Sequence, residues 1–110
     1  MAYDTVLADR IRAKVCRQPG FTEKQMFGGI CYMLNGNVCT GVIKDEMVIR
    51  QDPARTDELL RNKHIRMFDF SGRPMKGWFF VHLEGVESDE DLTYWAKAAI
   101  KYVRSLPAKK

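Results

Sequence analysis

Apolar positions recur at helical spacing near both ends of the chain. Leu7, Ile11 and Val15 are four residues apart with charged residues between them, which predicts an amphipathic helix over residues 3–17. A longer apolar stripe with the same period predicts a second helix over residues 88–106. We therefore expect one helix before and one helix after a central region of the chain.

Capping residues mark where the helices are predicted to begin. Asp4 and Ser88 precede the two apolar stripes, and their side chains suit the free N–H groups of a first helical turn. Asp52, followed by Pro53, predicts the start of a short third helix that ends near Asn62.

The central region reads as short strands separated by turn residues. Asn35-Gly36 lies between the apolar runs 30–34 and 37–43, and this pair favours the two-residue turn of a hairpin. A second tight turn at Asp45-Glu46 predicts a third strand over residues 47–50. Together the three strands form a predicted meander.

The hairpin turn also predicts which strand residues share a face. Regular pairing places Tyr32 opposite Cys39, because partners step in opposite directions from the turn. One predicted face carries Cys31, Met33, Val38, Thr40 and Val42. The other carries Ile30, Tyr32, Leu34, Cys39 and Ile43.

Two more strands follow the short helix. Residues 65–70 alternate between apolar and charged types, and residues 77–83 form a continuous apolar run rich in strand formers. Residues 21–25 are interpreted as a connection. The predicted order is α-β-β-β-α-β-β-α, an antiparallel α+β fold with helices packed on the sheet. We expect one domain over residues 1–110 and no second domain.

Composition favours a globular protein outside the membrane. Hydrophobic residues make up 45% and charged residues 29% of the chain, both close to globular averages. No apolar run approaches the roughly 18 residues of a membrane span, and the N-terminus lacks a signal-peptide pattern. We expect a cytoplasmic protein. Its net charge of +4 can favour anionic partners without requiring them.

No residue pattern predicts an active site. Cys16, Cys31 and Cys39 have no paired spacing, which favours reduced thiols and disfavours a zinc site. His64 and His82 stand in no recognisable cysteine-nucleophile context. We expect no catalytic residue, metal or cofactor; a thiol-dependent enzyme is kept as a third alternative.

A first glycine-containing motif consists of Met26, Phe27, Gly28 and Gly29. A phosphate-binding loop would need a helix after the glycines, whereas a strand is predicted here. We interpret the motif as structural, because glycine lets the backbone turn closely into a sheet.

A second motif, Ser71–Trp78, places two cations, a methionine and a tryptophan in one predicted turn between strands. Loops often carry recognition, and Arg and Trp are enriched at energetic centres of interfaces. The candidate interaction surface is therefore Arg73, Met75, Lys76 and Trp78. The remaining motif residues, Gly72, Pro74 and Gly77, are interpreted as structural. Two alternatives stay open: a structural role for the whole segment, and stacking of a nucleic-acid base on Trp78.

These two motifs make the sequence resemble the TfoX/Sxy N-terminal domain family. The other matching pieces are residues 1–4, Leu7–Arg12, Glu23–Gln25, Asn35–Asn37, Met67–Phe70 and Arg104–Pro107. The resemblance covers nearly the whole chain. It implies an α+β domain without established catalysis, known as the first half of bacterial competence regulators that act with a cyclic-AMP receptor protein at promoters.

Those regulators carry a second, helical domain, whereas this chain resembles a stand-alone member. From the resemblance and the candidate surface we expect a non-enzymatic regulatory domain that binds a protein partner in transcription. Direct nucleic-acid binding, through the basic first helix and the same segment, is the alternative. Exposed strand edges are also compatible with a homodimer.

Overall fold

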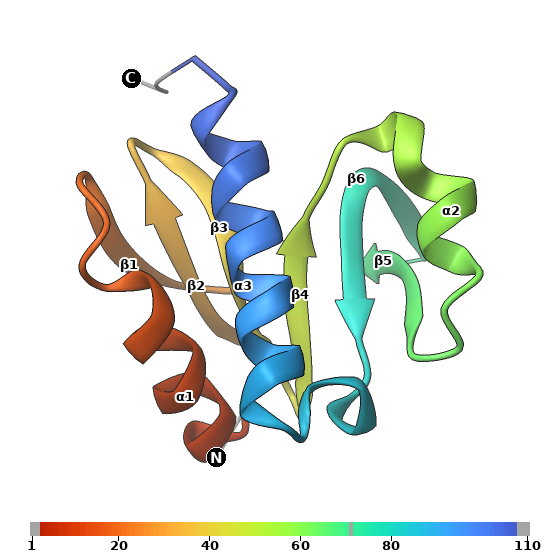
Figure 1. Cartoon of the computed structure of the whole chain (residues 1–110), viewed down its shortest axis with the longest axis horizontal. Helices are drawn as coiled ribbons and strands as arrows, with labels where there is room; N and C mark the ends of the chain where they lie inside the picture. The colour runs from red at the N-terminus through yellow and green to blue at the C-terminus, as the bar shows by residue number, and fades with distance from the viewer. Residues whose placement is uncertain (1–2, 71, 108–110) are drawn as a thin grey trace.

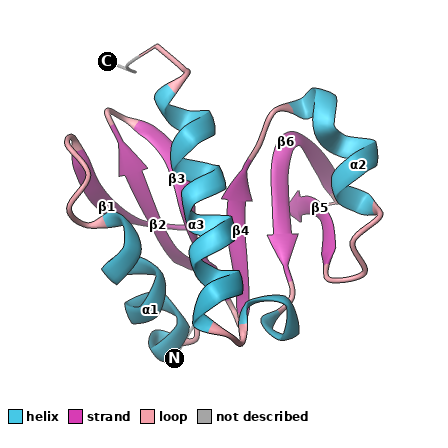
Figure 2. Ribbon diagram, viewed as in Figure 1, coloured by secondary structure: helices cyan, strands magenta, loops and turns pink. Residues whose placement is uncertain are grey.

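The fold is an antiparallel sheet with two helices packed along one face (Figure 1). The computed structural model describes residues 3–70 and 72–107, and the side chains of Phe70 and Arg73 fall outside that description. The elements are α1 (Thr5–Val15), β1 (Phe21–Met26), β2 (Gly29–Leu34), β3 (Asn37–Ile43), β4 (Glu46–Arg50), the 3-10 helix η1 (Pro53–Arg55), α2 (Thr56–Leu60), β5 (Ile65–Phe70), β6 (Arg73–Val81), the 3-10 helix η2 (Leu83–Val86) and α3 (Asp89–Arg104). Figure 2 shows how the helices and strands alternate along this order.

The strands of the described region form one six-stranded sheet in the order β1-β2-β3-β4-β6-β5. All the pairings are antiparallel. The predicted α+β class is therefore confirmed. α1 and α3 cover the same face, and α2 lies beside the β5–β6 hairpin at the far end of the sheet (Figure 1).

The structure adds one strand to the predicted order, which becomes α-β-β-β-β-α-β-β-α. Residues 21–25, interpreted above as a connection, belong to the edge strand β1, which pairs with β2. Thr22, Glu23, Lys24 and Gln25 are all exposed. An edge strand with this polar composition carries almost no hydrophobic pattern, and this explains why the prediction was wrong.

The Asn35-Gly36 turn is confirmed, but the regular register beyond it is wrong. Cys39 is an extra residue on β3, so Tyr32 pairs with Thr40 instead. Such a bulge shifts the alternation of side chains by one residue. Because both predicted faces of the hairpin carry apolar residues, the sequence pattern did not reveal this shift.

The bulge moves three β3 residues to the faces opposite to those predicted. Thr40 pairs with Tyr32 and Ile49 and so lies on the helix-covered face. Val42 pairs with Ile30 and packs under the helices. Ile43 packs on the other face of the sheet. Ile43 also pairs with Glu46, so the second turn is Lys44-Asp45, one residue earlier than predicted.

In the segment predicted as the turn 71–78, Ser71 lies outside the described residues, Gly72 lies in a turn as predicted, and residues 73–78 are strand. β6 begins at Arg73, which pairs with Phe70, and Pro74 pairs with Asp69. β4 pairs with β6 only from Trp78 onward. The first half of β6 thus extends beyond the end of β4. Proline has no backbone N–H to donate, and it is tolerated there because no β4 carbonyl lies beside it.

The predicted caps are confirmed. Asp4 Oδ1 accepts the Leu7 N–H at 3.0 Å, and Ser88 Oγ accepts the Asp91 N–H at 3.0 Å. Asp52 Oδ1 accepts the Ala54 N–H at 2.9 Å and begins η1, which leads into α2. None of the helices in the described part of the chain is long and apolar enough to cross a membrane.

The main core lies between the helices and the sheet. Its largest fully buried members include Leu7, Ile11, Tyr32, Leu34, Met47, Ile49, Phe79 and Leu92. The Tyr32 hydroxyl donates to the Ala8 carbonyl at 3.0 Å, which ties α1 to β2. A second, smaller cluster lies on the opposite face of the sheet and consists of Ile43, Val48, Phe68 and Phe80, with Phe27, Met75 and Trp78 packed against it.

Candidate interaction surfaces

The two glycine-containing motifs, distant in sequence, meet on the face of the sheet opposite to α1 and α3. Phe27 comes from the β1–β2 turn, and its ring centroid is 6.2 Å from that of Trp78 on β6. Phe68 on β5 lies beneath both, 5.4 Å from each ring. We call this group, with Met75 and Phe80, the aromatic cluster.

The backbone of the first motif explains its glycines. Met26 pairs with Gly29, so Phe27 and Gly28 form a two-residue turn with φ values of 56° and 76°. A Cβ on Gly29 would lie 2.0 Å from the Val42 carbonyl oxygen, so only glycine fits there. Positive φ costs a residue such as phenylalanine about 1–2 kcal/mol. The ring packing of Phe27 offsets that strain.

The second motif contributes both buried and exposed side chains. Met75 and Trp78 are half-buried in the aromatic cluster, whereas Lys76 and Pro74 are exposed. Lys76 makes no salt bridge with any residue that the structure describes. The side chain of Arg73 lies outside the described residues. A Cβ on Gly77 would lie 3.0 Å from the Gln51 carbonyl oxygen.

Arg50, which no sequence motif singled out, borders the aromatic cluster. It pairs with Trp78 across β4 and β6, and its Cζ lies 4.8 Å from the centroid of that ring. The same Cζ is 5.9 Å from the ring of Tyr102 on α3. Its Nε is buried without a hydrogen-bond partner among the described residues. Arg50 therefore links the aromatic cluster to the C-terminal part of α3.

Cys31 and Cys39 are buried among apolar residues, whereas Cys16 is half-buried at the end of α1. Burial raises the pKa of the Cys31 thiol to about 11 and that of Cys39 to about 12. Neither is a thiolate at neutral pH, and the thiolate is the nucleophilic form. Among residues 3–70 and 72–107, no group of three or more His, Cys, Asp or Glu is arranged to hold a metal ion.

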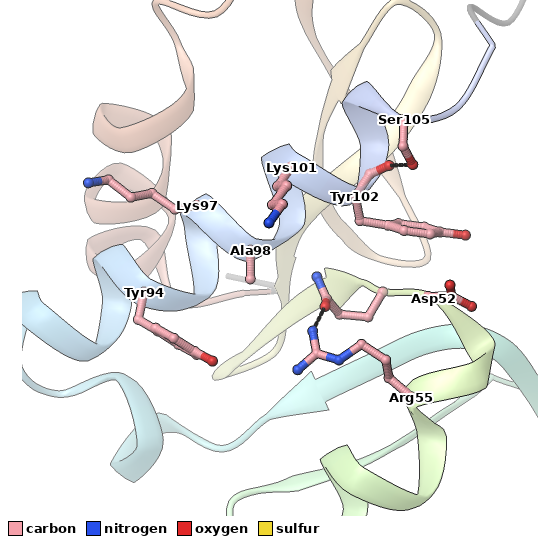
Figure 3. A pocket seen from close by; sticks show the side chains of 9 residues that line it. Asp52, Arg55, Tyr94, Lys97, Ala98, Lys101, Tyr102 and Ser105 are labelled. Carbon is pink, nitrogen blue, oxygen red and sulfur yellow. Dashed lines mark hydrogen bonds between the residues drawn. The ribbon is translucent and has the colours of Figure 1, made fainter.

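A cleft beside α3 was not predicted from the sequence. It has a volume of about 540 Å³ and lies between α3 and the segment that joins β4 to η1 (Figure 3). Its lining consists of Gln51, Asp52, Arg55, Tyr94, Lys97, Ala98, Lys101, Tyr102 and Ser105.

One sequence signal could have indicated this cleft. Tyr94, Ala98 and Tyr102 repeat every four residues and lie outside the buried stripe of α3. Tyr94 is 57% exposed. Aromatic residues on the solvent side of an amphipathic helix are a departure from its pattern. The partner residues Gln51 and Arg55 could be assigned to the same site only from the tertiary structure.

Comparison with known proteins identifies the family but no near relative. The model of the TfoX N-terminal domain matches residues 15–103 of this chain. The match includes both glycine-containing motifs and most of α3. No curated protein and no solved structure matches the chain significantly.

Proposed function

Because the chain belongs to the TfoX N-terminal domain family, we propose that it is a non-enzymatic regulatory domain that binds a protein partner through the aromatic cluster and its rim. The regulatory part of this proposal rests on membership of this family, because the resemblance of the chain to competence regulators implies a role in bacterial transcription and competence. A cytoplasmic location is part of the same proposal.

The observation that carries the proposal is the convergence of both motifs on one helix-free face. Half-buried Met75 and Trp78 lie there, exposed Lys76 is next to Met75 on β6, and Arg50 stacks on Trp78. Interfaces concentrate their binding energy on aromatic and arginine side chains surrounded by a polar rim. Without a partner on this face, the half-buried side chains of Met75 and Trp78 stay partly in water.

Direct nucleic-acid binding through α1 is less well supported, because its cations have intramolecular partners. Arg12 pairs with Glu23 at 2.8 Å, and Lys14 pairs with Asp89 at 2.9 Å. Arg10 donates to the Val86 carbonyl at 2.9 Å. Binding to phosphates would require these contacts to be exchanged for new ones.

The test is capture of partners from a bacterial lysate on the tagged chain, with and without nuclease. Lys76→Glu reverses a charge at the proposed rim, and Lys63→Glu makes the same change at the opposite end of β5, where Lys63 is also exposed. A protein that survives nuclease, is retained by Lys63→Glu and is lost with Lys76→Glu supports the proposal. A partner retained equally by both variants contradicts the surface. Recovery that depends wholly on nucleic acid contradicts the protein-binding role.

A further inference from the structure

The cleft beside α3 has features of a small-molecule site that the proposed function does not use. It lies between α3 and the segment that follows β4 (Figure 3), and its lining residue Tyr102 contacts Arg50, which also stacks on Trp78 of the aromatic cluster. Its volume of about 540 Å³ is within the range of about 300–1,000 Å³ typical of ligand pockets.

A fixed guanidinium lies on one side of this cleft. Gln51, only 2% exposed, accepts a hydrogen bond from Arg55 Nη1 at 2.5 Å through its amide oxygen. Glu58 accepts from Arg55 Nη2 at 2.8 Å and from Nε at 3.4 Å. These contacts involve three of the five N–H donors of an arginine. Tyr94 also interacts with the Arg55 side chain as a hydrogen-bond partner. The guanidinium is therefore held in place while one of its donors stays available.

A second cation lies across the cleft on α3. The Lys101 side chain lies on the α3 side of the cleft, whereas the Lys97 side chain extends away from Arg55 (Figure 3). Lys101 has no salt bridge to a described residue. Glu58 offsets part of the charge of Arg55, and an anion placed between Arg55 and Lys101 interacts favourably with both.

Flat apolar surfaces lie next to these cations. Tyr94 and Tyr102 are two helical turns apart on α3, about 12 Å along its axis, with Ala98 between them. The Tyr94 ring extends toward Arg55, whereas the Tyr102 ring extends toward the side of the cleft that carries Asp52 (Figure 3). Each offers a π-face for offset stacking or edge contact with a planar ligand.

We propose that this cleft binds a small organic anion, with its phosphate or carboxylate between Arg55 and Lys101 and its flat ring against Tyr94 or Tyr102. The proposal does not require partner binding at the aromatic cluster, although Arg50 contacts both Trp78 and Tyr102. A nucleoside monophosphate and an aromatic carboxylate share the required chemistry, and the experiment separates these two sources.

The experiment follows backbone amide and tyrosine ring NMR signals of the full chain during titration with four probes. AMP and 4-hydroxybenzoate carry both a ring and an anionic group, whereas adenosine and inorganic phosphate carry one each. We expect saturable shifts at Tyr94, Ala98, Lys101 and Tyr102 with AMP or with 4-hydroxybenzoate, and the tighter of the two identifies the source. Adenosine and phosphate should bind at least about tenfold more weakly, because each lacks one set of contacts.

Variants test the assigned residues. Lys101→Gln should weaken binding about tenfold through loss of a charged hydrogen bond. Lys24→Gln removes the same charge from exposed β1, outside the cleft, and should leave binding unchanged. Arg55→Lys keeps the charge but loses the fork that Gln51 and Glu58 hold, so it should also weaken binding. Amide spectra confirm that each variant is folded.

Several results would overturn the proposal. One is the absence of saturable shifts with all four probes at millimolar concentration. Adenosine binding as tightly as AMP would remove the anion site, and phosphate binding as tightly as both ring-containing anions would remove the ring contact. Equal affinity of Lys101→Gln and Lys24→Gln would contradict the position of the site. Shifts at these residues with a single-stranded oligonucleotide or an acidic peptide, and not with the small anions, would contradict the ligand class.

Discussion

The ring of Phe27 lies edge-on to the indole of Trp78, with an interplanar angle of 85°. Phe27 adjoins β2, and β3 and β4 separate β2 from β6 in the sheet. Three strand spacings correspond to about 14 Å in a flat sheet, yet the ring centroids are 6.2 Å apart. The β1–β2 turn therefore reaches over the helix-free face, and the two motifs build one surface.

Substitution of Phe27 separates ring packing from backbone strain. Phe27→Ala loses the ring and keeps a Cβ at φ 56°, so we expect a loss of about 2 kcal/mol in unfolding free energy for this partly buried site. Phe27→Gly loses the same ring but tolerates positive φ, and should be more stable than Phe27→Ala by about 1 kcal/mol. Urea denaturation measures both values. A glycine variant no more stable than the alanine variant would contradict the strained turn.

Two neighbouring glycines give a matched test of close approach. A Cβ on Gly29 would lie 2.0 Å from the Val42 carbonyl oxygen, whereas a Cβ on Gly28 meets nothing within 4 Å. Gly29→Ala should destabilise the domain by more than about 3 kcal/mol, since β2 and β3 must separate. Gly28→Ala should cost only the positive-φ penalty of about 1 kcal/mol. Similar thermal unfolding midpoints for the two variants would rule out this explanation of the motif.

The buried thiols predict how stability changes at high pH. The pKa of Cys39 is raised from 9.0 to about 12 by burial, so above pH 9 the unfolded chain loses a proton that the folded chain keeps. Its contribution to stability is complete below pH 9 and decreases as pH rises toward 12, by about 1.4 kcal/mol per pH unit.

Comparison with Cys39→Ala isolates this contribution. Between pH 9.5 and 10.5 the unfolding free energy of the parent chain should decrease more steeply than that of the variant, by about 1.4 kcal/mol per unit. Parallel pH profiles from urea denaturation would show that Cys39 titrates normally in the folded protein.

Local signals in the sequence were sufficient for much of the fold. Asn35-Gly36 defined its turn because both residues tolerate positive φ, and Asp4 and Ser88 defined helix starts through their own side-chain oxygens. Features that depend on neighbouring strands were wrong. The β1 edge strand has no apolar alternation, and the Cys39 bulge changes register without a change of composition.

The surfaces were harder to predict than the elements. The sequence singled out both motifs, but it gave no sign that Phe27 and Trp78 are in contact, because their proximity depends on the order in which the strands pair and on the position of the β1–β2 turn. Residues 73–78 were wrongly predicted as part of a turn, since Pro74 and Gly77 are typical of turns and here lie on a strand that extends beyond its neighbour. Arg50, Gln51 and Arg55 acquire their roles only through contacts with Trp78, α3 and Glu58.

The central claim is that the face built by both motifs is the partner-binding face. The most direct measurement is the NMR spectrum of the isotope-labelled chain, titrated with a protein partner purified by capture on the unmodified chain. We predict that the largest changes occur at Phe27, Gly28, Met75, Lys76 and the indole N–H of Trp78. Changes confined to α1 or to the cleft residues Tyr94, Lys101 and Tyr102, with the aromatic cluster unaffected, would contradict the claim.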